Sequence, residues 1–196
     1  MTRGRMPFVR SSPRPRRSNR LRPAIAVVCV VAIGLAIGSV ALLLGGHRPS
    51  IEAQRNALRN YASAAQSLAQ EGGGVVQQAM KPAVGSLQAG SPDRSLPADA
   101  SGWADQMQRL HDEWRRLVHP QDLETTHRLF VRALAAYVSA ARDIAAAARG
   151  SMTVVAAIRA GQTGDRLWDQ AAGRLRREFL RLGLTVPGWV AASQPA

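Results

Sequence analysis

The side chains best suited to chemistry are concentrated in residues 111–127, which read HDEWRRLVHPQDLETTH and hold three of the four histidines. Within this stretch, Glu124-x-x-His127 places a carboxylate and an imidazole on the same face of a helix. Ferritin-like bundles bind two metal ions with two such pairs and a glutamate from each of two further helices. No second pair occurs in this chain, so we predict neither a di-metal site nor a cofactor.

The same stretch leaves a smaller arrangement open. A mononuclear metal site could draw on His111, His119, Glu124 and His127, whose side chains are of the types that bind zinc. His111 and His127 belong to different predicted helices, so the sequence does not bring them together. A histidine on the apolar face of a helix is more often a hydrogen-bonded part of the core. We therefore interpret His127 as a buried structural residue and assign no metal ligand.

Asp165 interrupts an otherwise apolar stripe and is the second candidate for a buried polar residue. A buried carboxylate is costly unless it is paired. An arginine, His127 or the Tyr137 hydroxyl could satisfy it, and the result would be a structural contact. Asp165 could instead mark a ligand pocket. We favour the structural interpretation.

Catalytic signatures are missing from the sequence. The only cysteine, Cys29, lies in a hydrophobic stretch, and there is no Gly-x-Ser-x-Gly and no serine beside a histidine. The triplet of glycines at 72–74 is not followed by Lys-Ser or Lys-Thr, so it is no phosphate loop. Trp103, Trp114 and Trp168 are spaced as core residues. We predict no catalytic residue and no enzymatic activity.

Helices must position these residues, because apolar residues recur at spacings of three and four throughout the region after residue 50. Ser50 is placed to cap a first helix, which we expect the glycines at 72–74 to break. A second, weaker helix carries Val76, Met80, Val84 and Leu87, and Pro82 should kink it. A polar linker follows at about residues 89–99.

Three further helices complete the prediction. The third has a stripe that runs from Trp103 to Leu117, and Pro120 stands where a first-turn proline belongs in the fourth. Gly150-Ser151 resembles a C-cap followed by an N-cap, but the turn into the fifth helix could instead lie at residues 161–164. The fold class predicted for residues 47–196 is an all-α, antiparallel helical bundle.

The hydrophobic stretch predicts a single transmembrane helix at residues 23–46. Residues 24–46 carry no charge, and at about 1.5 Å per residue they match a hydrocarbon core of about 30 Å. The alternative is a signal peptide that is cleaved after Ala41. Cleavage there would leave three leucines at the new N-terminus, so we expect an uncleaved anchor. Gly34 and Gly38 are spaced for close packing of two such helices in a homodimer.

Charge predicts the orientation of this helix. Eight arginines and no acidic residue precede Pro23, which leaves 18 cationic and 13 acidic residues in the rest of the chain. The positive-inside rule then keeps residues 1–22 in the cytoplasm, as a disordered basic tail, and exports residues 47–196 across the inner or plasma membrane. The tail needs no other partner than the lipid bilayer, and we do not expect it to bind nucleic acid.

The last part of the chain resembles a loosely defined group of extracytoplasmic helical domains in bacterial membrane-anchored proteins. The resemblance covers about residues 120–190 and depends on Pro120, His127, Tyr137, Asp165, Asp169, Leu182-Gly183-Leu184 and Trp189. It implies a helical, exported domain and supplies no functional residue.

The sequence therefore favours a single-pass, membrane-anchored module with a structural or protein-binding role. Its partner would be a protein at or near the membrane, and an exposed apolar stripe on the second helix would contact that partner. The alternative is an extracytoplasmic domain that binds a ligand or metal inside the bundle, at His127, Asp165 and their neighbours.

Overall fold

The computed structural model describes residues 49–191. The chain divides into two units, Met1–His47 and Arg48–Ala196. The predicted tail, the predicted transmembrane helix and the glycine pair Gly34 and Gly38 lie outside the described residues. Within residues 49–191, no helix is both long enough and apolar enough to cross a membrane.

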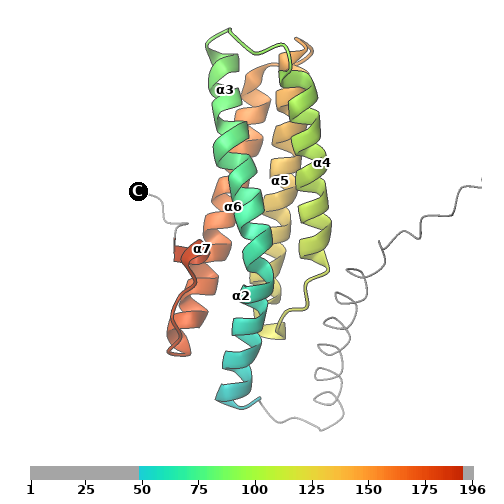
Figure 1. Ribbon diagram of the computed structural model, residues 1–196. Coiled ribbons are helices and arrows are strands. Elements are labelled where there is room, and N and C mark those ends of the chain that lie inside the picture. Colours follow the sequence, from blue (N-terminus) through green and yellow to red (C-terminus); the bar gives the residue numbers. More distant parts are fainter. Residues whose placement is uncertain (1–48, 192–196) are drawn as a thin grey trace, which may run out of the picture. The chain divides into compact units, whose positions relative to one another are not determined.

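All regular structure in residues 49–191 is helical, which confirms the all-α prediction. Successive long segments run up and down the bundle and are joined by short connections (Figure 1). α5 packs along both α4 and α6, and the short α7 lies against α6 and α2. The elements are α2 (Ile51–Gly74), η1 (Val75–Met80), α3 (Lys81–Gln88), α4 (Leu96–Arg115), η2 (Gln121–Leu123), α5 (Glu124–Ala148), α6 (Val154–Arg181) and α7 (Gly188–Ala191).

The first three elements form one continuous helical segment, residues 51–88, which we call the first rod (Figure 1). As predicted, Ser50 caps it, with its hydroxyl oxygen 3.2 Å from the amide nitrogen of Ala53. The predicted break at the three glycines is wrong. Gly72 is buried, and a Cβ added there would be in ordinary van der Waals contact with a methyl carbon of Leu110, at 3.5 Å. Tertiary packing along this face offsets the helix penalty of about 1 kcal/mol for each glycine.

The first rod changes its winding directly before Pro82. Val75–Met80 is a π-helix, and the amide of Lys81 donates to the carbonyl of Val76, five residues earlier. Pro82 has no amide hydrogen to donate and occupies the first turn of α3. The π-helical segment therefore ends directly before the helical turn that contains Pro82. The linker is also shorter than predicted, because Pro97 belongs to the first turn of α4 and only residues 89–95 connect the two helices.

The turn between α5 and α6 lies at Gly150, and the alternative at residues 161–164 is excluded, since α6 runs through them. Gly150 has a φ of 73°, a left-handed conformation that favours glycine at a helix C-terminus. Ser151 does not cap α6, because its hydroxyl donates back to the carbonyl of Ala146 at 2.9 Å. Thr153 holds the N-cap position without a side-chain bond.

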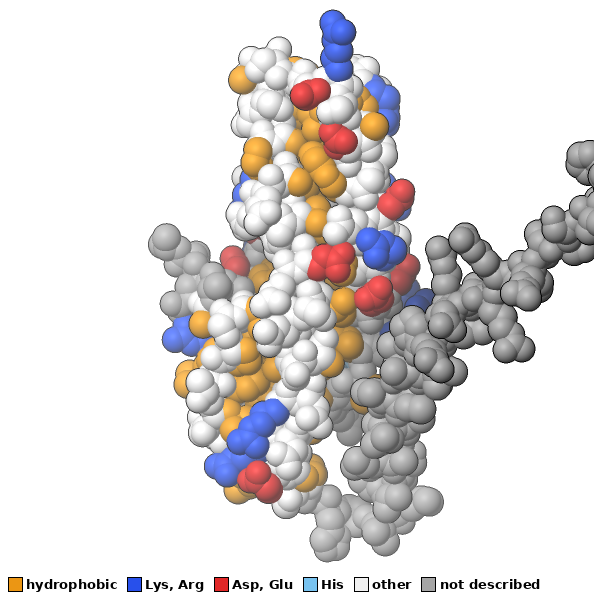
Figure 2. Space-filling model, in the orientation of Figure 1, with side chains coloured by type: hydrophobic (Ala, Val, Ile, Leu, Met, Phe, Trp, Pro, Cys, Tyr) orange, Lys and Arg blue, Asp and Glu red, His pale blue; other side chains and the backbone are white. Residues whose placement is uncertain are grey.

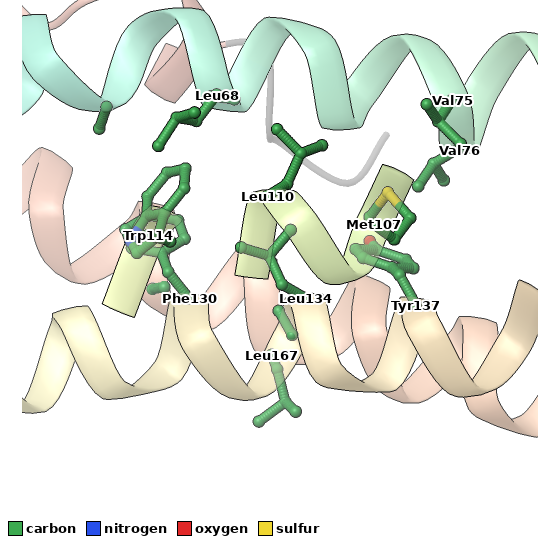
Figure 3. Close-up of a cluster of buried hydrophobic side chains, with 14 of the residues drawn as sticks. Leu68, Val75, Val76, Met107, Leu110, Trp114, Phe130, Leu134, Tyr137 and Leu167 are labelled. Carbon is green, nitrogen blue, oxygen red and sulfur yellow. The ribbon is translucent and has the colours of Figure 1, made fainter. Parts of the chain in front are cut away.

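The core is built in layers between the first rod, α4 and α5 (Figure 3). Leu68, Trp114 and Phe130 form one layer in that view, and Leu110 and Leu134 form the next. The third layer comprises Val75, Val76, Met107 and Tyr137. Met107, Leu110 and Trp114 lie on the stripe that the sequence predicts from Trp103 to Leu117.

Tyr137 is held by an unusually close contact with α6. A Cβ added to Gly164 would lie 2.6 Å from Cε1 and 2.7 Å from Cδ1 of the Tyr137 ring. Only glycine leaves room for the ring against the α6 backbone at this point. Gly164 is therefore required by packing and does not end the helix.

We expect Gly164→Ala to destabilise the bundle by about 1–3 kcal/mol, because the new methyl group forces the ring away from α6. Alanine is the better helix former by about 1 kcal/mol, so helix propensity alone gives the opposite sign. Urea unfolding of the full-length chain, followed by tryptophan fluorescence, measures the difference.

Gly173→Ala is the matched control. Gly173 lies in the same helix, and the nearest atom to an added Cβ is Nη1 of Arg177, at 3.9 Å. We expect this substitution to stabilise the bundle by about 0.5–1 kcal/mol. Equal effects of the two substitutions would contradict the role given to the Tyr137 contact.

Candidate functional site

Three of the four predicted metal candidates meet at the end of the bundle where α2 begins. Nε2 of His119 lies 2.5 Å from Oε2 of Glu124, and the other carboxylate oxygen pairs with Arg128. These two partners lower the pKa of Glu124. The His119 ring stacks on His127, with centroids 3.9 Å apart and an angle of 10° between the rings. His111 contacts Gln108 and Asp112 on α4 and is not part of this cluster.

His127 is buried, as predicted, and its Nδ1 lies 3.4 Å from the Tyr61 hydroxyl. Burial first, and the stacked His119 second, lower the pKa of His127 to about 4, against the opposing effect of Glu124. Burial likewise raises the pKa of Tyr61. The pair is therefore neutral near pH 7, and this supports the structural interpretation of His127.

The stacked rings do not suit a shared metal ion. An imidazole binds a metal through the lone pair in its ring plane, at about 2.0–2.1 Å. Because the His119 and His127 rings are nearly parallel, their lone pairs run side by side and do not converge. Within residues 49–191, no group of three or more His, Cys, Asp or Glu side chains is arranged to hold a metal.

A cavity of about 530 Å³ opens between the first rod and α6, which we call the main cavity. α7 contributes Trp189 to it, and core residues of α4 and α5 line its inner side. In Figure 2, apolar side chains gather on the surface beside α2, on the side where α7 lies. The lining residues are Ala69, Gln70, Gly72, Gly73, Val76, Gln77, Lys81, Met107, Leu134, Tyr137, Asp165, Trp168, Asp169 and Trp189.

A smaller cavity of about 180 Å³ borders the main cavity at Lys81, Tyr137 and Asp165. It shares Val76, Lys81, Tyr137 and Asp165 with the main cavity, and the rest of its lining is largely aliphatic. Residues of the π-helix η1 line both cavities. Irregular helical winding of this kind is frequent at functional sites.

Asp165 stands at the junction of the two cavities. The Tyr137 hydroxyl donates to its Oδ1 at 2.7 Å, and the Lys81 ammonium lies 3.9 Å from its Oδ2. Tyr137 is one of the partners that the sequence suggested. Burial is the main cause that raises the pKa of Tyr137, and the bond to Asp165 adds to it. The phenol is therefore a proton donor near pH 7.

The prediction that Asp165 is buried is wrong. Its side chain is 41% exposed, because the buried face of α6 passes through Gly164 and Leu167 on either side of it. The next carboxylate along α6 is Asp169, which also lines the main cavity. Burial raises the pKa of Asp169, the charge of Asp165 raises it further, and Lys81 opposes both.

The aromatic residues of the region form one cluster. The Trp114 ring packs against Phe130 with centroids 5.0 Å apart, and against Trp168 at 5.6 Å. Trp189 of α7 joins them, 5.8 Å from Phe130 and 6.4 Å from Trp168. Trp168 and Trp189 thus connect the core to the wall of the main cavity.

Comparisons of the chain with protein-family models, with curated proteins and with solved structures found no match. The sequence indicated Asp165 and Tyr137, but it gave no sign that Lys81 and Gly73 share a cavity with them. Gly73 and Lys81 lie more than 50 positions before Tyr137 and Asp165 in the chain. Only the packing of the first rod beside α6 brings the two pairs together.

The lowered pKa of His127 predicts how stability depends on pH. Below about pH 6.5 the unfolded chain takes up a proton at this histidine, whereas the folded chain does so only near pH 4. The free energy of unfolding should therefore fall by up to about 3 kcal/mol as the pH drops through this window. His127→Gln should remove this contribution to the pH dependence of the free energy of unfolding.

Urea unfolding of the unsubstituted protein and of His127→Gln, at several pH values between 7 and 4, measures how the free energy of unfolding of each depends on pH. Parallel slopes would show that His127 is not the group responsible.

Proposed function

We propose that the chain is a membrane-tethered helical module that binds a small ligand in the main cavity. The observation that carries the proposal is the cavity of about 530 Å³, whose wall combines aromatic and aliphatic side chains with the polar groups of Gln70, Gln77, Lys81, Tyr137, Asp165 and Asp169. Ligand sites commonly have volumes of about 300–1,000 Å³ and this mixture of lining residues. The membrane tether remains a proposal from the sequence.

Protein docking is supported less well by the geometry. The stripe expected to be exposed on the second helix is turned inward: Val76 and Met80 are buried, and Val84 and Leu87 pack against the core. The large apolar residues that are exposed in the described part are distributed over both ends of the bundle. They are Ile51, Val118, Met152, Val155 and Leu180.

We propose binding without catalysis. The raised pKa of Tyr137 keeps its phenol protonated, so it is a poor nucleophile and a poor base. Asp165 already accepts the phenol proton in a hydrogen bond. Both groups are suited to orienting a polar part of a ligand, while the aromatic wall takes up its apolar part.

Gly73→Leu is expected to abolish ligand binding while the fold is kept. Gly73 lines the main cavity, and no atom lies within 4 Å of an added Cβ, so a leucine side chain has room to enter it. Replacement of a helical glycine should also stabilise the first rod by about 1 kcal/mol. Loss of binding would then not be caused by unfolding.

Binding is measured by ¹⁹F NMR on the full-length chain in lipid nanodiscs, with 5-fluorotryptophan in place of tryptophan. A panel of water-soluble aromatic amines, alcohols and acids should shift the Trp168 and Trp189 resonances in a saturable way and leave Trp103 unchanged. Gly85→Leu is the control, since Gly85 is also a helical glycine with no atom within 4 Å of an added Cβ, and it lies outside the cavity. If no compound shifts Trp168 or Trp189, the proposed function is wrong.

The tether is tested by cysteine labelling in a Cys29→Ala background. A cysteine at Ser101, which is exposed on α4, should react with a membrane-impermeant maleimide on intact cells or spheroplasts. A cysteine at Ser18 in the tail should react only after the membrane is opened. Tags at the two ends of the chain should also stay on one polypeptide. The reverse labelling pattern would contradict the orientation, and separation of the tags would show cleavage.

A further inference from the structure

The charged side chains that line the main cavity include more carboxylates than cations. They are Asp165, Asp169 and Lys81, and the Lys81 ammonium lies 3.9 Å from Asp165. Asp169 forms no hydrogen bond or ion pair with any residue in the described part of the chain. The lining therefore carries one carboxylate that no cation of the cavity pairs with.

The charges of Asp165 and Lys81 also act on Asp169. Burial and the charge of Asp165 together raise the pKa of the Asp169 carboxyl, and Lys81 offsets them only in part. The Asp165 charge that repels a second anion at this place attracts a cation there. Asp165 and Asp169 are also four residues apart on α6, where like charges destabilise a helix.

The aromatic residues of the cavity complement these carboxylates. Trp168 lies between Asp165 and Asp169 in the sequence of α6, and Trp189 lines the cavity from α7. Indole faces attract ammonium groups and also bury apolar surface. An anionic ligand would find only Lys81, which already lies beside Asp165.

We propose that the main cavity takes a small organic cation, a primary or secondary amine that carries an apolar or aromatic body. Its ammonium group lies at Asp169 and Asp165, and its body lies against Trp168 and Trp189. This assignment rests on the proposed ligand-binding function and adds the chemical class of the ligand.

Three probes of similar shape and different charge test the assignment: benzylammonium, benzyl alcohol and benzoate. Their affinities for the full-length chain in nanodiscs are measured at pH 7 from the ¹⁹F shifts of Trp168 and Trp189. Benzylammonium should bind about tenfold or more tightly than benzyl alcohol, and benzoate most weakly. Equal or tighter binding of benzyl alcohol or benzoate overturns the cation preference and leaves ligand binding standing. Binding of none of the three overturns both.

Asp169→Asn separates recognition from a structural role. Benzylammonium affinity should fall about tenfold, while benzyl alcohol affinity stays unchanged. The thermal midpoint should stay the same or rise, because repulsion from Asp165 is relieved. Loss of affinity for both probes, or a lower midpoint, overturns the assignment. Asp143→Asn, a half-buried aspartate of α5 outside the cavity, should change neither affinity.

Lys81→Gln gives a change in the opposite direction. It removes the only cation of the lining, so benzylammonium should bind more tightly and benzoate more weakly. Weaker binding of benzylammonium would contradict the proposed charge preference.

Discussion

The packing of the Tyr137 ring on the backbone of α6 at Gly164 determines the arrangement of the cavities. The ring occupies the space that any Cβ at Gly164 would need, so α5 and α6 approach closely at this level. This places the Tyr137 hydroxyl on Asp165, and Asp165 in turn lies beside Lys81 of the first rod. One packing contact therefore fixes three polar groups from α5, α6 and α3 at the junction of the two cavities.

Where the first rod lines the main cavity, two of its features lower its stability as a helix. It keeps three consecutive glycines inside a helix, and its π-helical winding replaces regular hydrogen bonding before Pro82. On α6, Asp165 and Asp169 present like charges on one face. The remaining helices are packed around a continuous apolar core, so these features stand out from the rest of the bundle. Local losses of this kind are tolerated where a site requires them.

Much of the fold could be predicted from the sequence, because local signals dominate helix formation. Ser50 caps the first helix as expected, Gly150 is one of the two turns that the sequence allowed after the fourth helix, and the stripe predicted for α4 is its buried face. The break predicted at residues 72–74 is wrong, because the packing of the first rod on the rest of the bundle compensates for weak helix propensity. Asp165 is partly exposed because α6 buries the nearby Gly164 and Leu167 instead. Which residues of a helix are buried depends on the neighbours that the helix meets.

The sequence by itself determined the helical class, the N-cap at Ser50 and the chemical types of side chain available, since these depend on spacing, caps and composition. It also gave Tyr137 as one of three possible partners for Asp165. Only the tertiary structure decided that His119 stacks on His127 and leaves no converging ligands, and that Lys81, Asp169 and Trp189 share one cavity. The physical reason is that each of these contacts joins different helices or turns. Their geometry therefore follows from how whole helices pack, which local spacing does not encode.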